Sequence, residues 1–419
     1  MKKGIRKKIR NYLFNIIPEN MRRKLLLSRF DLNEIATTEL TLKVAETDDE
    51  ILQALNIHYK SYLATNLIKD QRNPFRLTKY QLLPSSTILV AKKGNKVVGT
   101  LSVIGRGELG LPIESGWDIQ SLTNKYAAIY EISAMAVDLE YPKNPGEVLF
   151  PLLKFMFEYT IDYLNAEAII CVFNKLVEPF CRDILCCKPI KSFKGNYKLV
   201  RDSKPLAYYM DARKMSRLYK KVYAKHSNKT NLYKYFFTNG PSKNTIFPER
   251  EYFKSSDYRL TPRLIKKAID NNFNFKELNL IEKENIANAL SNPSLIVAAG
   301  LEEGVPRNYQ RSSARVTFFS NGVIQDKKCN LMYYTKCINV STNGLKVKVL
   351  GRKLECGTQL ELRIPIADKN ILRLNVQVVS KQQENTYGLQ LNNVSKQWID
   401  FIEHQQSSIK QFKETDEVA

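Results

Sequence analysis

Tyr130-Glu-Ile-Ser-Ala-Met-Ala-Val137 is a mostly apolar run that carries a single carboxylate, Glu131. An apolar run of this length is typical of a buried strand. A helical pattern follows it at residues 148–164, and a second buried strand is expected at residues 168–173. This alternation of strand and helix indicates an α/β class for this part of the chain.

The same alternation continues on both sides of this strand and predicts an α/β (α+β) domain over residues 39–212. The expected elements are a strand at 42–45, a helix at 48–62, a hairpin of strands 86–92 and 96–104 around Lys93-Gly-Asn95, a strand at 128–137, helices at 148–164 and 178–185, and strands at 168–173 and 206–210.

The rest of the chain has two different patterns. Residues 213–304 contain few strand signals and two expected helices, 261–271 and 282–290, so we interpret them as a basic, helical extension and linker. In residues 305–410, six short strands separated by turns precede an amphipathic helix at 395–405. Even strand spacing with glycine turns predicts a small six-stranded antiparallel β-barrel.

The chain holds 65 Lys and Arg against 42 Asp and Glu, for a formal charge of +23. Such an excess predicts an anionic partner: a nucleotide, a nucleic acid or a lipid headgroup surface. Residues 1–30 hold ten basic residues and one Glu, and residues 213–234 hold eight basic residues and no acid. Because the remaining chain is only mildly basic and neither basic stretch sits on a recognised nucleic-acid fold, we expect no specific nucleic-acid partner.

The basic N-terminal segment, residues 1–38, contains two amphipathic patterns. Residues 3–17 place isoleucines and basic residues on different faces, and residues 20–30 combine leucines with basic residues after Pro18. Such helices suit an anionic inner membrane surface, to which they would attach the protein peripherally. The alternative is that the apolar faces pack on the protein's own core while the cations stay solvated.

Residues 213–238 combine the second basic stretch with six tyrosines and phenylalanines. Three interpretations are open for them. They are a second interfacial segment with aromatics at headgroup level, the wall of a groove for an acidic partner such as an acyl carrier protein, or a solvated helix followed by a linker.

The seven cysteines stand at spacings that do not suit a metal site, and the three histidines are far apart in the sequence. We therefore expect no metal site. An odd number of cysteines without paired spacing also favours a reducing, cytoplasmic compartment.

Two short motifs accompany the first strands of the predicted barrel. Arg311-Ser-Ser-Ala-Arg315 precedes the first strand, and Asn339-Val-Ser-Thr-Asn-Gly344 joins the next two. Arginine grips a phosphate through two N–H groups and stacks on purines, and guanine offers O6 and N7 to such a fork. Gly344 permits a close approach or a positive φ at the turn. The alternative is two surface charges and an ordinary turn.

Together the motifs resemble the PilZ family pattern, Arg-x-x-x-Arg followed by Asp/Asn-x-Ser-x-x-Gly, over about residues 305–405. The resemblance implies binding of cyclic di-GMP. The residues that it assigns to the nucleotide are Arg311, Arg315, Asn339, Ser341 and Gly344. The arginines would hold phosphates and stack on guanines, and the Asn and Ser would hydrogen-bond a guanine edge. Arg307 and Arg311 form an overlapping pair, but Arg311 and Arg315 are preferred because Arg315 directly abuts the strand.

The element order of residues 39–212 and the strand Tyr130–Val137 resemble the GNAT acyltransferase fold. The similarity is greatest to its N-acyl amino acid synthase branch, which is related to acyl-homoserine-lactone synthases. The resemblance implies transfer of a long acyl group from an acyl carrier protein or coenzyme A thioester to an amine such as an amino acid. It also implies that two adjacent parallel strands splay apart, so that free backbone amides hold the donor. The implied donor-binding residues are Met135 and Val137 on the strand, and Lys143 and Gly146 at the phosphate-binding start of the next helix.

Two departures from this family pattern bear on the substrates. Ala134 stands where the branch has an arginine, which removes a charge that would recognise the acceptor. The phosphate loop matches the pattern only at Gly146, with Lys143 as a basic substitute. This favours a carrier-protein donor, whose prosthetic arm has a single phosphate.

Acyl transfer to an amine needs a base for the ammonium proton and a proton donor for the leaving thiolate. Glu131 is the candidate base, and the alternative is a structural carboxylate bonded to backbone amides. Cys181 stands where many GNAT enzymes have an acidic tyrosine, so the acid stays unassigned. For Cys181 itself, a buried structural thiol is favoured over an acyl-enzyme.

The predicted function is therefore a cyclic di-GMP-regulated N-acyltransferase. The alternative is a non-enzymatic cyclic di-GMP effector whose degenerate GNAT-like domain binds a protein partner or a lipid. The two hypotheses differ in whether an N-acyl product forms from an acyl carrier thioester and amino acids.

Overall fold

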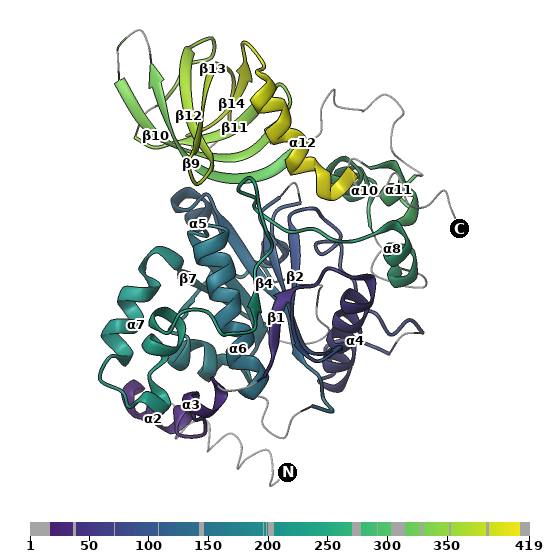
Figure 1. Ribbon diagram of the computed structural model, residues 1–419, viewed down its shortest axis with the longest axis vertical. Coiled ribbons are helices and arrows are strands. Elements are labelled where there is room, and N and C mark those ends of the chain that lie inside the picture. The colour runs from purple at the N-terminus through teal and green to yellow at the C-terminus, as the bar shows by residue number, and fades with distance from the viewer. Residues whose placement is uncertain are drawn as a thin grey trace.

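The computed structural model describes residues 17–410, apart from 37–38, 71, 108, 142–145, 196, 198, 200–204, 270–277, 291, 303–314, 327–328, 330, 352 and 383–384. The described residues form an eight-stranded mixed sheet with helices on both faces, and a closed six-stranded barrel beyond one end of that sheet (Figure 1). The predicted combination of an α/β domain with an antiparallel barrel is confirmed.

The sheet has the strand order β6-β7-β5-β4-β3-β2-β1-β8. Its strands are β1 (Thr41–Val44), β2 (Ser86–Lys93), β3 (Lys96–Gly105), β4 (Ile129–Val137), β5 (Ala168–Asn174), β6 (Lys188–Pro189), β7 (Pro205–Asp211) and β8 (Thr245–Ile246). The adjacent strands β4 and β5 are parallel, whereas β4 pairs antiparallel with β3 and β5 pairs antiparallel with β7.

Two apolar cores lie on the two faces of this sheet, because successive residues of a strand point to opposite sides. Tyr130 and Ile132 of β4 join the core under α6 (Gly146–Phe157), which a π-helical turn, Glu158–Tyr163, extends. Ile129 joins the core under α4 (Asp48–Ala64) on the other face.

Residues 213–304 build part of both cores. Tyr219 and Tyr223 of α7 (Met215–Tyr223) are buried on the α6 side. The helices α8 (Pro262–Ile269), α10 (Leu280–Leu290) and α11 (Pro293–Ala298) bury leucines on the α4 side, and β8 pairs with β1. The region interpreted from its sequence as an extension and linker thus packs against the sheet.

The second basic helix pattern of the N-terminal segment folds onto the protein itself. It forms α2 (Glu19–Leu27), followed by the short α3 (Leu32–Ile35). In α2, Leu27 is buried, and Arg23 is buried with its Nε donating to the Asp183 carbonyl at 2.8 Å. For this helix the alternative of packing on the protein's own core holds, except that two of its cations are also drawn inward. Nearly all of the first predicted helix, residues 3–17, lies outside the described residues.

Within the described ranges, no helix is both long and apolar enough to cross a bilayer. No group of three or more His, Cys, Asp or Glu residues in the same ranges is arranged to hold a metal ion.

Arg22 joins α2 to the short π-helix η3 (Phe180–Ile184). Its Nε and Nη2 donate to the two carboxylate oxygens of fully buried Asp183, at 3.0 and 2.9 Å, and Arg182 donates to the same carboxylate. Burial opposes ionisation of Asp183, but the two arginines hold its pKa below the usual value. The pair should therefore stabilise the fold above the carboxyl's unfolded pKa and lose that effect as the pH falls through its folded pKa.

We expect Arg22→Ala to lower the free energy of unfolding by about 2 kcal/mol near pH 7, because it removes two charge-assisted hydrogen bonds from a buried carboxylate. Denaturant titration with helix circular dichroism measures the loss, and Lys24→Ala, at an exposed position of the same helix, is the matched control. Equal stabilities of the two variants would contradict the assignment.

The barrel closes in the order β10-β11-β14-β13-β12-β9. Its strands are β9 (Val316–Asp326), β10 (Leu331–Ser341), β11 (Gly344–Val349), β12 (Gln359–Ala367), β13 (Asn370–Lys381) and β14 (Thr386–Leu391). The helix α12 (Lys396–Lys410) covers the barrel core with Trp398, Phe401 and Ile402.

The barrel contacts the sheet directly. Phe319 of β9 lies edge-on to Tyr130 of β4, with ring centroids 5.5 Å apart, and is itself part of the α6-side core. Lys348, 6% exposed, donates to the carbonyl of Asn124 at 2.8 Å, near the C-terminal end of α5 (Gln120–Lys125). Lys336 forms an ion pair with Glu167. These contacts fix the barrel over β4.

Candidate functional site

The parallel strands β4 and β5 separate half-way along their length. They pair from Ile129 with Ala168 to Ile132 with Cys171, although β4 continues to Val137 and β5 to Asn174. Beyond that point the facing backbone groups of the two strands are not joined in a ladder. A splay of this kind was expected from the family resemblance.

A β-bulge at Ala134 contributes to the splay. Ser133 faces Ser102 of β3, but Ala136 faces Thr100, so β4 carries one extra residue here. Ala134 adopts a φ of +53°, which is uncommon for a residue other than glycine. Bulges bend a strand and redirect its side chains. Ala134 is also buried, so this position offers no charge to an acceptor.

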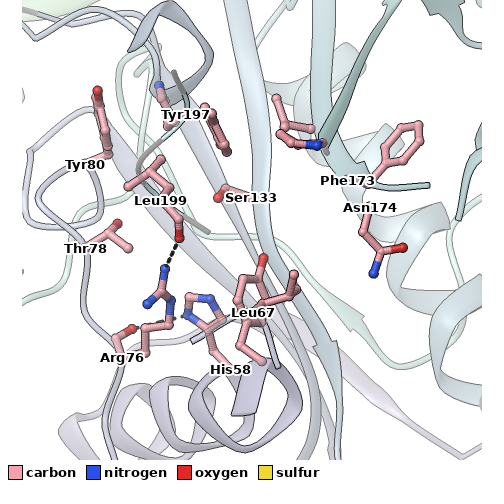
Figure 2. A pocket seen from close by; sticks show the side chains of 14 residues that line it. His58, Leu67, Arg76, Thr78, Tyr80, Ser133, Phe173, Asn174, Tyr197 and Leu199 are labelled. Carbon is pink, nitrogen blue, oxygen red and sulfur yellow. Dashed lines mark hydrogen bonds between the residues drawn. The ribbon is translucent and has the colours of Figure 1, made fainter. Parts of the chain in front are cut away.

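A narrow cleft opens at the splay, with a free volume of about 50 Å³ (Figure 2). Ser133 of β4 and Phe173 and Asn174 of β5 form one part of its lining, and α4 and the following segment form another. The remaining lining residues are His58, Tyr62, Leu67, Arg76, Thr78, Tyr80, Pro112, Val172, Tyr197, Leu199 and Pro205.

Arg76 places a buried cation in this cleft. The residue is 5% exposed, its Nη2 donates to the Leu199 carbonyl at 2.6 Å, and its guanidinium lies 5.2 Å from the Tyr62 ring centroid (Figure 2). Its Nε is buried and has no hydrogen-bond partner among the described residues. The lining of the cleft contains no carboxylate. A buried cation in this setting is suited to an anionic group of a ligand.

His58 lies beside Arg76 and is neutral. Its Nδ1 is 3.2 Å from the Arg76 carbonyl, which can only accept, so we assign the ring proton to Nδ1. Burial, and then the charge of Arg76, lower the pKa of His58 well below its usual value. Its Nε2 therefore carries a lone pair at neutral pH.

Glu131 lies behind the cleft wall. It is 1% exposed, and its Oε2 accepts a hydrogen bond of 2.8 Å from the backbone amide of Ile113 in η1 (Pro112–Ser115). Burial raises the pKa of Glu131 well above its usual value. Glu131 does not line the cleft itself, but Pro112 and Ser133, its neighbours through η1 and β4, both do.

A second and larger cavity, about 380 Å³, lies between the barrel and the sheet. Arg315, Asn339 and Lys346 line it from the barrel. A bulge between Cys337 and Asn339 shifts the register of β10 against both neighbouring strands. Cys337 points into the barrel core, and the extra residue lets Asn339 line the outer cavity. The Asn339 Oδ1 is buried and has no hydrogen-bond partner among the described residues.

Family models match both halves of the chain. Residues 53–207 match the model described as N-acyl amino acid synthase FeeM, and residues 307–405 match the PilZ domain. The chain joins a FeeM-like domain to a PilZ domain. No curated protein sequence matches it.

Solved structures are similar to each half. FeeM, an N-acyl amino acid synthase from uncultured soil microbes, is 18% identical, with 43% of this chain and 95% of that chain covered and a TM-score of 0.36. The coenzyme A-dependent acyl-homoserine lactone synthase BjaI is 10% identical, with coverages of 51% and 95% and a TM-score of 0.34. The PilZ domain of YcgR from Escherichia coli, solved with c-di-GMP, is 12% identical, with coverages of 24% and 92% and a TM-score of 0.21.

The residues predicted to bind the donor in the FeeM-like domain do not gather in the cleft. Met135 and Val137 pack against the α6-side core, whereas Ser133 lines the cleft on the α4 side. Gly146 is the buried first residue of α6, and Lys143 lies outside the described residues. Cys181 is buried, and its contact with the Cys171 thiol and its burial raise its pKa well above the usual value, so it is a protonated thiol.

In the PilZ domain, four of the predicted nucleotide residues are described, and two of these four line the same cavity. Arg315 and Asn339 share the larger cavity, whereas the Ser341 hydroxyl donates to the Gly344 carbonyl at 3.1 Å and shapes the turn. A Cβ on Gly344 would lie 2.6 Å from the Leu389 carbonyl oxygen, so the glycine is needed for close approach rather than for a positive φ. Arg311 lies outside the described residues.

The second basic stretch lies around α7 and lines a groove of its own. Lys214, Arg217 and Lys221 surround apolar side chains that include Leu218. The aromatic residues of this stretch do not form an interfacial surface, because most of them are in the α6-side core. Asp211, another residue of this groove, pairs with Ala168 at the start of β5. The groove therefore lies away from the open end of the splay.

Sequence reasoning missed the polar residues on which the two sites depend: His58 and Arg76 in the cleft, and Arg106, Glu114 and Lys346 in the larger cavity. None stands in a motif, and Arg76 reaches β4 and β5 only because the segment after α4 folds back over the splay. The aromatic residues around Arg76 in sequence carried no pattern that could have indicated this site.

Proposed function

We propose that the FeeM-like domain transfers an acyl group from a carrier-bound thioester to the amino group of an amino acid, and that the PilZ domain binds cyclic di-GMP. The observation that carries the first half is the splay of β4 and β5 beside a cleft with one buried cation, Arg76, and with the buried carboxyl group of Glu131, whose pKa is raised by burial, behind its wall.

The reaction needs the chain to stabilise the oxyanion, to hold the donor arm and to accept the ammonium proton. The neutral amine nitrogen attacks the thioester carbonyl carbon, the C–N bond forms, the C–S bond breaks, and the departing thiolate takes the proton that the nitrogen gives up. Beyond Ile132, β4 no longer pairs with β5. The backbone amides that it presents there are suited to the developing oxyanion and to the donor arm. The start of α6 at Gly146 is suited to a phosphate of that arm. An acyl carrier protein remains the donor that we favour over coenzyme A, for the reasons given by the sequence.

Burial favours Glu131 over His58 as the base. The same desolvation makes a carboxylate more basic and an imidazole less basic, and the charge of Arg76 weakens His58 further. Since Glu131 does not line the cleft, it takes the ammonium proton through one intervening water or the Ser133 hydroxyl.

Arg76 supports an amino acid as the acceptor. Its guanidinium can offer N–H groups other than the one that binds Leu199 to the acceptor's carboxylate. It would thus supply the charge that the family pattern places at position 134, from a different element of the fold.

The decisive experiment incubates the full chain with acyl carrier protein thioesters or acyl-coenzyme A and a mixture of amino acids, with and without cyclic di-GMP. We expect mass spectrometry to detect an N-acyl amino acid, formed faster from the carrier protein. Absence of product under all conditions would overturn the enzyme proposal and favour the effector alternative.

For the PilZ domain, we expect Arg315→Ala to weaken cyclic di-GMP binding at least tenfold, because it removes one of the cations of the larger cavity. Calorimetry on the full chain measures the affinity. Arg217→Ala, which removes an exposed cation in α7, is the control for net charge. Undiminished binding by Arg315→Ala would refute this nucleotide site.

A further inference from the structure

The cavity that holds the PilZ motif residues has a second wall, and that wall belongs to the FeeM-like domain. Arg106, Gly107 and Glu114 line it opposite Arg315, Asn339 and Lys346. Arg106 donates to both carboxylate oxygens of Glu114, from Nε at 2.9 Å and Nη2 at 3.0 Å. Arg106 directly follows the end of β3, and Glu114 belongs to η1.

We propose that the cyclic di-GMP site is shared between the two domains, with Arg106 completing it, and that nucleotide binding moves η1 (Pro112–Ser115) and so opens the acyl-transfer cleft. This rests on the proposed binding of cyclic di-GMP by the PilZ domain, and adds to it a residue from outside that domain and a route to Glu131.

The charges of the cavity fit such a ligand. Arg106, Arg315 and Lys346 face one carboxylate, Glu114, so the cavity carries a net positive charge that matches the two phosphates of cyclic di-GMP. The Arg106 fork is already aimed by its bidentate contact with Glu114. A phosphate is a bidentate partner of the same geometry, so it competes with Glu114 for the guanidinium. The buried Asn339 Oδ1, which accepts nothing from the described residues, is an acceptor for a guanine N–H in the same cavity.

Displacing Glu114 has a consequence within η1. Its Oε1 also accepts from the Leu111 amide at 2.8 Å and thereby holds the start of η1. Two residues later, the Ile113 amide donates to Glu131 at 2.8 Å, and Pro112 between them lines the cleft. One short helical turn therefore connects the nucleotide cavity, the candidate base and the cleft.

The size of the cleft gives the direction of the effect. Its free volume of about 50 Å³ is far below the roughly 300 Å³ or more of ordinary ligand pockets, so it has to widen to admit an acceptor. Pro112 lines the cleft and lies between Leu111 and Ile113, so a movement of η1 displaces it. Cyclic di-GMP is thus an activator, and by linkage the acceptor amino acid tightens nucleotide binding by the same factor.

Calorimetry of the full chain tests the shared site. Arg106→Met should weaken cyclic di-GMP binding at least tenfold, whereas Glu114→Gln should tighten it severalfold because the competing charge is lost. Arg217→Met should leave the affinity unchanged. If Arg315→Ala loses binding but Arg106→Met and Glu114→Gln both bind as the wild type does, the PilZ site stands and the shared site is refuted. If the wild type itself does not bind, both proposals fail.

Tryptophan fluorescence tests the movement without relying on catalysis. Trp117 follows η1, its amide donates to the Ile113 carbonyl at 2.9 Å, and its ring lies 5.3 Å from that of Tyr197 in the cleft lining. The other tryptophan, Trp398, donates to the carbonyl of Thr342 within the motif Asn339–Gly344, so Trp398→Phe leaves a single reporter. In that background, saturating cyclic di-GMP should change the Trp117 emission, and Arg106→Met should suppress the change even at saturation. An unchanged emission with bound nucleotide would overturn the proposed movement.

Discussion

Glu131→Gln should slow acyl transfer by about 10²- to 10⁴-fold, the range expected when a general base is removed. The substitution keeps the acceptor oxygen for the Ile113 amide and removes only the basicity, so the fold and the position of η1 should persist. Single-turnover rates with saturating donor and acceptor measure the effect. Glu140→Gln, at an exposed carboxylate just beyond β4, is the matched control.

The pH dependence gives this prediction a second readout. Burial raises the pKa of Glu131 well above its usual value, so the wild-type rate should rise with pH through that pKa, and Glu131→Gln should lack this limb. A raised folded pKa also means that stability present below the unfolded pKa is lost as the pH rises through the folded pKa. The variant should therefore lose less stability than the wild type over that window.

His58→Gln separates the two candidate bases. Suppose that His58→Gln abolished transfer while Glu131→Gln kept both the rate and its rise with pH. The base would then be the imidazole that lines the cleft, and the assignment of Glu131 would be wrong. A full rate in both variants would remove both residues from the chemistry.

Arg76→Gln should raise the KM for the amino acid acceptor by about a hundredfold, because the carboxylate would lose its charge-assisted hydrogen bonds in a buried site. The corresponding amine without a carboxylate should react poorly with the wild type and at a nearly unchanged rate with the variant. Arg76→Lys should recover part of the preference, since it keeps the charge but not the fork.

Two comparisons protect this result from a merely structural explanation. Arg72→Gln removes an exposed arginine from the same segment. It should change neither the KM for the amino acid nor the rate with the amine that lacks a carboxylate. If Arg76→Gln slowed the amino acid and the plain amine equally, then Arg76 would act by holding Leu199 in place and would not recognise the carboxylate.

The order of the elements and both family motifs were readable from local patterns, because alternation, helical periodicity and turn residues are properties of adjacent residues. The positions of Arg22 and Arg76 were not, since a cation is drawn inward only by a partner elsewhere in the chain, such as Asp183. Register was equally hidden: the bulge between Cys337 and Asn339 lets Asn339 line the cavity, whereas simple alternation from the core residue Cys337 would turn it toward the barrel core. Residues 213–304 lacked amphipathic strands of their own, yet β8 gains a place in the sheet by pairing with β1.

The contact of Phe319 with Tyr130, and of Lys348 with the α5 carbonyls, restricts how this architecture can be inherited. A chain truncated before the barrel would expose an aromatic ring at the centre of its sheet and leave helix-end carbonyls without their ammonium. Recombination with an unrelated regulatory domain would lose the same contacts unless the replacement domain supplied an equivalent aromatic ring and cation. The two domains are therefore expected to be inherited together. An engineered exchange of either domain would have to preserve the contacts of Phe319 and Lys348.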